Sequence, residues 1–308
     1  MKSNNKVLAI IFFVLLAVWV LRKTSFKPSD RSFKETLVSL DTSAIDRIVM
    51  YPNGLSGSQY ELIKEGTQWK AKNDQMEVPA SNKEVKSILL LLENLPTKQL
   101  ISKSKDRHTD YELDDDTGKF VEVYSGNKLL EKLVVGRFNF NQATRQSVSY
   151  ARLAEEDDIY AIDGFLSMTF AKDFNSFRNK NLGAFDPLEV QSFMFTNEGN
   201  IQIYEKKEGA TWQTSSGMTI DSSKMASYLN KIKNVTGKDF VDGYQPQANP
   251  NASLKLEVAG RSVPWQVDYF QEGDNRIFKS AENDAYFASD SLGLYKTLIQ
   301  GLNDLNNG

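Results

Sequence analysis

Histidine and cysteine, the side chains used most often for nucleophilic and metal chemistry, are almost absent from this sequence. The chain has 308 residues, a single histidine, His108, and no cysteine. The lack of cysteine excludes disulfides, thiolate nucleophiles and cysteine-ligated metal sites. The residues on both sides of His108 are charged or polar, so we expect it in an exposed loop without the partners that a catalytic histidine needs.

Carboxylates gather at two places, Asp114–Asp116 and Glu155–Asp158. The first group does not fit an EF-hand calcium loop, which needs a third ligand before its glycine and a glutamate at the twelfth position. We expect hairpin turns and no metal at both places. A carboxylate pair that cleaves glycosidic bonds is set by geometry and not by sequence spacing, so that chemistry stays open.

Known phosphate and acyl-transfer motifs are missing as well. The sequence contains neither glycine-rich phosphate loop, Gly-x-Gly-x-x-Gly or Gly-x-x-x-x-Gly-Lys-Ser/Thr, and no Gly-x-Ser-x-Gly. We therefore predict no catalytic residue and no cofactor, and we expect that the protein is not an enzyme.

The composition is that of a globular protein with about two domains. Hydrophobic residues make up 40% of the chain, and 37 basic side chains face 40 acidic ones. A nucleic-acid-binding protein would need a clustered basic surface, so we expect no nucleic acid partner.

An apolar segment lies close to the N-terminus, between Lys6 and Arg22. Its fifteen residues would span about 22 Å as a helix, which is short for a bilayer but can be extended by flanking basic residues and Trp19. We predict a signal anchor over residues 1–23 and a polar tether over residues 24–43. The predicted anchor side chains are Val7, Leu8, Ile10, Ile11, Phe12, Phe13, Leu15, Leu16, Trp19 and Leu21.

A cleaved signal peptide and a buried helix are the alternatives for this segment. No small-x-small cleavage site follows the apolar residues, which favours the anchor. The basic residues on the two flanks do not set the orientation, whereas a very short N-terminal tail is the usual layout for export. We expect a single-pass inner-membrane protein with an extracytoplasmic, periplasmic body.

The rest of the chain contains an internal repeat. Residues 64–69 (KEGTQW) match residues 207–212 (KEGATW) at an offset of 143. Each block ends a predicted hairpin, and we expect Trp69 and Trp212 to anchor the cores of their own copies. A helix follows in both copies, with apolar residues at i, i+3, i+4, i+7 and i+10. These stripes are Val85, Ile88, Leu89, Leu92 and Leu95, then Met225, Tyr228, Leu229, Ile232 and Val235.

Later elements also recur in the same order. The hairpin predicted over residues 120–135 has its counterpart over 254–270, and each copy closes on a short apolar helix, over 165–170 and 292–298. We predict an α+β fold, an N-terminal transmembrane helix followed by two tandem repeats, each an antiparallel sheet with one amphipathic helix. The repeats cover residues 44–171 and 188–304, and residues 172–187 join them.

Several short motifs, in this order, resemble the bacterial DUF4340 family. They are Gly-x-x-Trp before the helix, Leu133–Gly136, Ser149–Arg152, Ile159–Ile162 and Phe177–Leu182. The likeness covers most of residues 45–240, although the second copy has no Val-Gly strand end like Val135-Gly136. It implies a membrane-anchored envelope protein of the kind associated with gliding-type ABC transporter systems, and no catalytic residues.

The leading hypothesis is a non-catalytic, membrane-anchored envelope protein that serves an ABC transporter system as an accessory or interaction component. Its partners would be the membrane, through the N-terminal segment, and an envelope protein such as a transporter component. One alternative is a ligand-binding or sensory module with its site at the repeat junction. Another is a carboxylate-based hydrolase of envelope polymers. The oligomeric state is left open.

Aromatic residues are frequent in the strand-like segments of the second copy. We expect most of them in the core, although alternating aromatics on an exposed sheet face could bind a partner or a glycan. The residues concerned are Phe193, Phe195, Tyr204, Trp265, Tyr269 and Phe270.

Overall fold

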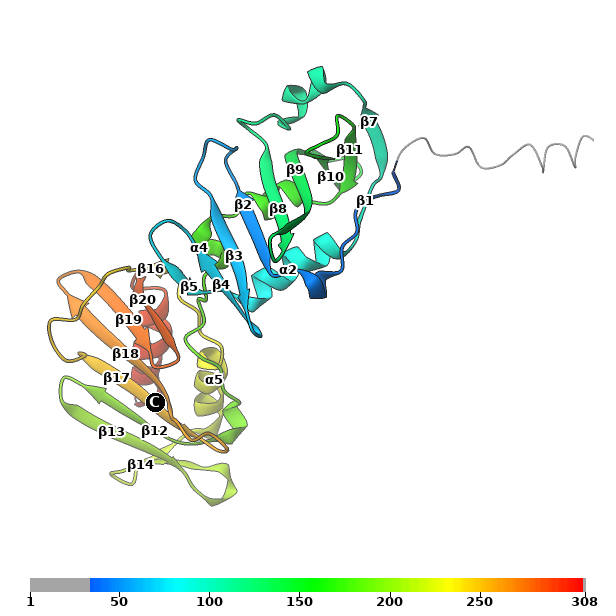
Figure 1. Cartoon of the computed structure of the whole chain (residues 1–308). Helices are drawn as coiled ribbons and strands as arrows, with labels where there is room; N and C mark the ends of the chain where they lie inside the picture. Colours follow the sequence, from blue (N-terminus) through cyan, green and yellow to red (C-terminus); the bar gives the residue numbers. More distant parts are fainter. Residues whose placement is uncertain (1–33, 307–308) are drawn as a thin grey trace, which may run out of the picture. The chain divides into compact units, whose positions relative to one another are not determined.

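The computed structural model describes residues 34–306, which fold into two compact units that divide between Phe177 and Arg178 (Figure 1). We call them the first and the second repeat. The division lies inside the joining segment predicted over residues 172–187.

The first repeat is built on a nine-stranded antiparallel sheet in the order β5-β4-β3-β2-β8-β9-β10-β11-β7. Two short strands, β1 and β6, pair separately. The strands are β1 (Thr36–Val38), β2 (Arg47–Tyr51), β3 (Tyr60–Glu65), β4 (Gln68–Lys72), β5 (Glu77–Pro79), β6 (Leu95–Pro96), β7 (Gln99–Ser102), β8 (Lys119–Ser125), β9 (Lys128–Asn141), β10 (Gln146–Leu153) and β11 (Ile159–Asp163).

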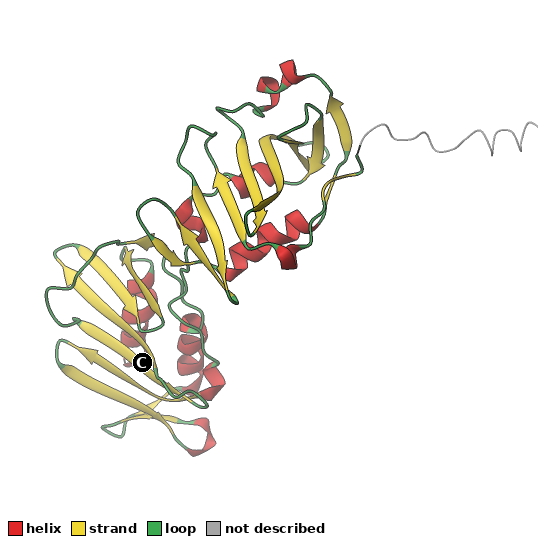
Figure 2. Ribbon diagram, in the orientation of Figure 1, coloured by secondary structure: helices red, strands yellow, loops and turns green. Residues whose placement is uncertain are grey.

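Three helices of the first repeat, α2 (Asn82–Glu93), α3 (Leu166–Phe170) and α4 (Phe174–Phe177), pack against one face of this sheet (Figure 2). Ser81 caps α2, and the predicted stripe turns Val85, Ile88 and Leu92 into the core. Three short 3₁₀ turns are η1 (Thr42–Ala44), η2 (Lys105–Arg107) and η3 (Thr109–Tyr111). A smaller apolar cluster, which includes Leu113 and Phe120, lies apart from the main core.

The second repeat has the same plan. Its nine antiparallel strands lie in the order β15-β14-β13-β12-β17-β18-β19-β20-β16, which matches the first sheet strand for strand. The strands are β12 (Val190–Asn197), β13 (Asn200–Lys206), β14 (Trp212–Thr214), β15 (Thr219–Ile220), β16 (Asp239–Phe240), β17 (Ala252–Val258), β18 (Trp265–Glu272), β19 (Asn275–Ser280) and β20 (Asn283–Ser289).

Helix α5 (Ser222–Ile232) corresponds to α2 and carries its stripe on the buried side. Asp221 caps it by accepting bonds from the backbone N–H groups of Ser223 and Lys224, at 2.7 and 3.1 Å. The repeat ends on a π-helical segment, η6 (Tyr295–Gln300), and helix α6 (Gly301–Asn306), beside the short turns η4 (Pro187–Glu189) and η5 (Glu208–Ala210). The predicted α+β fold with two antiparallel sheets is therefore confirmed, and α3 and η6 lie close to the short closing helices predicted over 165–170 and 292–298.

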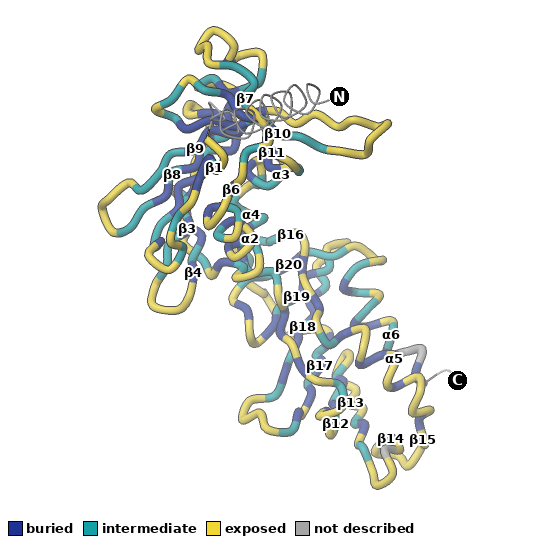
Figure 3. Tube along the Cα trace, turned by 90° about the vertical axis from the view of Figure 1, so that its right-hand side faces the viewer, coloured by how far each residue is buried: buried dark blue, intermediate teal, exposed yellow. Residues whose placement is uncertain are grey.

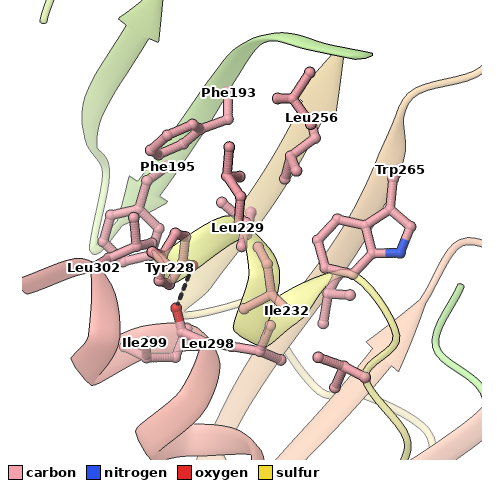
Figure 4. Packing of buried hydrophobic residues seen from close by; sticks show 14 of the residues in the cluster. Phe193, Phe195, Tyr228, Leu229, Ile232, Leu256, Trp265, Leu298, Ile299 and Leu302 are labelled. Atoms are coloured by element: carbon pink, nitrogen blue, oxygen red, sulfur yellow. Dashed lines mark hydrogen bonds between the residues drawn. The ribbon is translucent and has the colours of Figure 1, made fainter. Parts of the chain in front are cut away.

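Each repeat has its own core. Trp69 and Trp212 are buried in the cores of their respective repeats, as the sequence predicted. Most of the six aromatics were expected in the second core, and all except Phe270 belong to it, among them Phe193, Phe195 and Trp265, which pack beside α5 (Figure 4). Phe270 is buried outside this cluster.

The tether predicted over residues 24–43 is wrong in its second part. Residues 36–38 form β1, and Leu37 and Val38 are buried in the first core. The N–H of Leu40 also donates to the carbonyl of Leu92 at 3.1 Å. Residues 24–33 lie outside the described part of the chain.

The predicted membrane segment, with its anchor residues between Val7 and Leu21, also lies outside the described residues. Within residues 34–306, no helix combines the length and the apolar character that spanning a bilayer requires.

Candidate functional site

His108, the lone histidine, is buried, which corrects the expectation of an exposed loop. Its Nε2 lies 3.1 Å from the backbone carbonyl oxygen of Asp157. The loop of η2 and η3 therefore contacts a segment 49 residues further along the chain. A short polar stretch gives no sign of such a long-range contact.

The acidic clusters surround a buried arginine. Asp114 closes a turn by accepting bonds from the N–H groups of Asp116 and Thr117, as expected. Arg152, also buried, donates to the carbonyls of Leu113 at 3.0 and 3.1 Å and of Ala154 at 2.8 Å.

Burial lowers the pKa of Arg152, whereas nearby carboxylates act in the opposite direction: Asp115, Asp157, Asp114 and Glu155. The clusters thus compensate a buried positive charge. Within residues 34–306, no group of three or more histidines and carboxylates has the arrangement of a metal site.

Large apolar side chains are exposed together on the first repeat. Phe138 and Phe140 on β9 are 42% and 45% exposed, and Phe165 and Met168 beside them are 45% and 58% exposed. The ring of Phe165 lies 5.5 Å from that of Phe138 and 6.3 Å from that of Phe140. We call these four side chains the hairpin surface.

The pairing of β9 with β10 leaves the two rings uncovered. Residues two apart in a strand point to the same face, and the cross-strand neighbours of Phe138 and Phe140 are Ser149 and Ser147. These small side chains cannot cover a phenyl ring. Figure 3 shows the outer part of this hairpin as exposed.

Ser149 also holds the α3 side of the hairpin surface in place. It is buried, and its Oγ donates to the carbonyl of Gly164 at 2.8 Å and accepts from the N–H of Ser167 at 3.4 Å. Phe165 lies in the sequence between Gly164 and Ser167, the two residues that Ser149 contacts. Its ring is therefore positioned by the rigid sheet and not by a free loop.

The hairpin surface borders an open strand edge. β8 pairs with β9 only as far as Val135, so residues 138–141 have a strand neighbour on the β10 side alone within the described part of the chain. Exposed strand edges pair readily with other strands. The site combines apolar side chains with free backbone positions beside them.

The second repeat has no such extension. Its equivalent hairpin, β18 to β19, closes at the pair Glu272 and Asn275. The sequence reasoning missed the hairpin surface, although a signal was present: Phe-x-Phe in a segment from Arg137 to Arg145 that is otherwise polar and contains no acid.

The motifs that resemble DUF4340 have structural roles. A side chain on Gly136 would lie 2.0 Å from the carbonyl oxygen of Tyr111, so only glycine fits there. Phe177 is buried in the first core and Leu182 in the second. The carbonyl of Leu182 accepts a bond from the indole Nε1–H of Trp265 at 3.0 Å.

Comparison with known protein families supports the resemblance of these motifs to DUF4340. A family model described as "Domain of unknown function (DUF4340)" matches residues 69–257, more than half of the chain. No curated protein and no solved structure matches the sequence. The chain, with its two sheets of identical strand order, belongs to the DUF4340 family.

Proposed function

We propose that this protein is a non-catalytic, membrane-anchored envelope component that docks on a partner protein through the hairpin surface. The partner would be a component of a gliding-type ABC transporter system. The anchor would be the N-terminal apolar segment, with the body on the periplasmic side.

The hairpin surface carries this proposal. Isolated exposed apolar residues are ordinary, but a group of them on one rigid element marks an interaction site. Phenylalanine, methionine and arginine are the residue types enriched in protein interfaces. The segment from Arg137 to Arg145 supplies phenylalanine and arginine, and Met168 on α3 adds the methionine.

Three aromatic rings in contact also suit the energetics of docking. A few buried aromatic anchors carry most of the affinity of an interface. The ring of Phe165 already lies against those of Phe138 and Phe140, and the three are held by strand pairing and by Ser149. Little conformational freedom would be lost when a partner covers them.

Site-specific photocrosslinking in native membranes tests the proposal. A benzophenone amino acid in place of Phe140 should give a discrete adduct that contains a transporter permease, the component that reaches the periplasmic side. Phe138→Ser with Phe140→Ser should abolish the adduct made from a probe at Met168, because truncating a central aromatic typically costs about 2 kcal/mol or more, roughly 30-fold in affinity.

The control is a probe at Val263, which is 65% exposed on the second repeat. The same adduct from Val263, or no protein adduct from Phe140, would exclude the hairpin surface as the docking site. The ligand site at the repeat junction and the carboxylate hydrolase stay predictions, and no observation favours either.

A further inference from the structure

A groove runs between α5 and the C-terminal helices of the second repeat. It encloses about 560 Å³, which is within the range of about 300–1,000 Å³ typical of small-molecule sites. Its lining includes Tyr228 and Leu305, both buried. The Tyr228 hydroxyl donates to the carbonyl of Leu298 at 2.9 Å (Figure 4), so the ring is fixed.

Gly301 keeps the groove open. A Cβ at this position would lie 3.3 Å from two ring carbons of Tyr228, which is closer than an ordinary contact. Any larger residue would fill space beside the ring. The lining thus combines an aromatic ring, a leucine and a bare backbone position, which suits an apolar chain.

Positive charge lines the same groove. Lys224 and Lys231 on α5 and Lys296 on η6 belong to its lining, and the described lining contains no carboxylate. Among the side chains that the structure describes, no carboxylate lies within 4 Å of any of the three ammonium groups. We call this site the lysine groove.

A second hollow of about 330 Å³ shares Lys231 and Thr297 with the lysine groove and continues it. That end carries Lys238 together with Asp239 and Asp290. The end at Lys224 and Lys296 has no carboxylate in its described lining, and Lys224 interacts with Asp221, which caps α5.

The first repeat provides an internal comparison. At an offset of 140, its α2 has Glu84 and Leu91 where α5 has Lys224 and Lys231. Glu84 is already paired, since the Nζ of Lys172 lies 2.6 Å from its carboxylate. The fold itself therefore does not require lysines on this helix, and the lysine groove is a feature of the second repeat.

We propose that the lysine groove binds a long-chain fatty acid anion, with the carboxylate at the lysines and the acyl chain along Tyr228, Gly301 and Leu305. A small inorganic anion would fill only a fraction of the volume and would leave the apolar floor in contact with water. A neutral lipid would gain nothing from the three ammonium groups, whereas a carboxylate is attracted to them. The apolar segment of the chain itself, Val7 to Leu21, has basic flanks and would be repelled.

The test uses the full chain in phosphatidylcholine nanodiscs and palmitate that carries a diazirine and an alkyne. After irradiation, chymotryptic peptides are mapped by mass spectrometry. Labels are expected on peptides that contain residues 224–231 and 296–305. Excess palmitate should compete, whereas its neutral methyl ester should not. Shorter fatty acids should compete about fourfold less well for each methylene removed.

Replacing all three lysines, Lys224→Gln, Lys231→Gln and Lys296→Gln, should reduce labelling of the groove at least fivefold. Lys83→Gln with Lys86→Gln on α2 is the matched control and should leave it unchanged. Circular dichroism verifies that both variants fold, as expected for exposed positions. Labels outside these peptides, equal competition by the methyl ester, or full labelling of the triple variant would overturn the assignment.

Discussion

At the scale of single residues, Arg152 stands out because it is charged and almost wholly buried. Its guanidinium bonds to carbonyls of two loops, at Leu113 and at Ala154. The fixed fork of five N–H donors allows one side chain to satisfy several carbonyls at once, which an ammonium cannot do in the same directions. The loops that contain the acidic clusters are thus fastened to the end of β10.

Arg152→Lys should therefore destabilise the protein although it conserves the charge. Leaving buried carbonyls without donors costs about 1–3 kcal/mol each, so we expect a loss of about 3 kcal/mol in the free energy of unfolding. Urea denaturation measures it. Lys128→Ala, at the exposed turn between β8 and β9, is the control and should change stability by less than about 0.5 kcal/mol. A change that small for Arg152→Lys would contradict the fastening role.

Sequence reasoning at this scale succeeded where the residue type alone decides the outcome. Trp69 and Trp212 were placed in the cores because a large aromatic after a strand is seldom left in water. It failed for His108, which contacts the backbone of Asp157, and it predicted only turns at the acidic clusters and not their interaction with Arg152. Both failures come from contacts between residues about 40–50 positions apart.

At the scale of elements, the pairing of β8 with β9 places Glu122 opposite Lys132, with 2.8 Å between the carboxylate and Nζ. Burial alone would raise the pKa of Glu122. Hydrogen bonds from Lys132 and Tyr124 outweigh this effect and hold the pKa below its ordinary value. The ionised carboxylate is therefore favoured in the folded state.

This pair predicts a pH dependence. A carboxyl whose pKa is lowered by folding adds stability above its unfolded pKa, about 4.3, and loses it as the pH falls through the folded pKa. Glu122→Gln should cost roughly 1 kcal/mol at pH 7, and the difference from wild type should shrink below about pH 4.3. Urea titrations at pH 7, 4 and 3 measure it. A difference that is constant over this range would contradict the ion pair.

The outer part of the β9–β10 hairpin should be dispensable for folding. Residues 137–146 are all exposed, and the second repeat closes the equivalent hairpin without them. Replacing residues 141–146 by Asn-Gly, which favours a two-residue turn between the paired residues Phe140 and Ser147, should change the melting temperature of the protein by less than about 3 °C. Differential scanning calorimetry measures it. A collapse of the first repeat would mean that the extension is structural.

The helices and strands that could be predicted from the sequence are those with a clear periodicity of apolar residues. The apolar stripes of α2 and α5 were evident from their spacing alone. The prediction of a tether was wrong for residues 36–38 because a strand of three residues is too short to show an alternation of apolar and polar side chains. β1 is defined mainly by its pairing with β6. The length of β9 was missed because strand pairing, and not local composition, determines where a hairpin turns.

At the scale of the whole molecule, the two repeats share one plan and differ in what they add to it. The first carries the hairpin surface and the second carries the lysine groove. Divergence of this kind is compatible with folding because the hairpin surface extends the outer ends of β9 and β10 and the lysine groove lies on helices, so neither addition changes the order of the nine strands. The sequence predicted the duplication, whereas the additions appear only when the two sheets are compared position by position.

Each repeat should fold alone, because each has a separate core. The main cluster of the first contains buried residues from Leu37 to Phe177, and that of the second begins at Leu182. A fragment of residues 34–180 should unfold cooperatively, with a dispersed amide spectrum in nuclear magnetic resonance. A fragment of residues 34–150, which lacks β11 and α3, is the control and should not fold. A disordered spectrum from the longer fragment would show that the first repeat depends on the second.

The position of β7 at the sheet edge has a consequence for how the chain is made. Ser102 of β7 pairs with Ile159 of β11, so the edge cannot form until 57 more residues have left the ribosome. Such distant pairings slow folding. The same delay recurs between Phe240 and Phe287. Domains near the N-terminus fold first during synthesis, so the sheet of the first repeat can close before the first strand of the second repeat emerges. The two sheets, which could otherwise exchange strands, therefore form at different times.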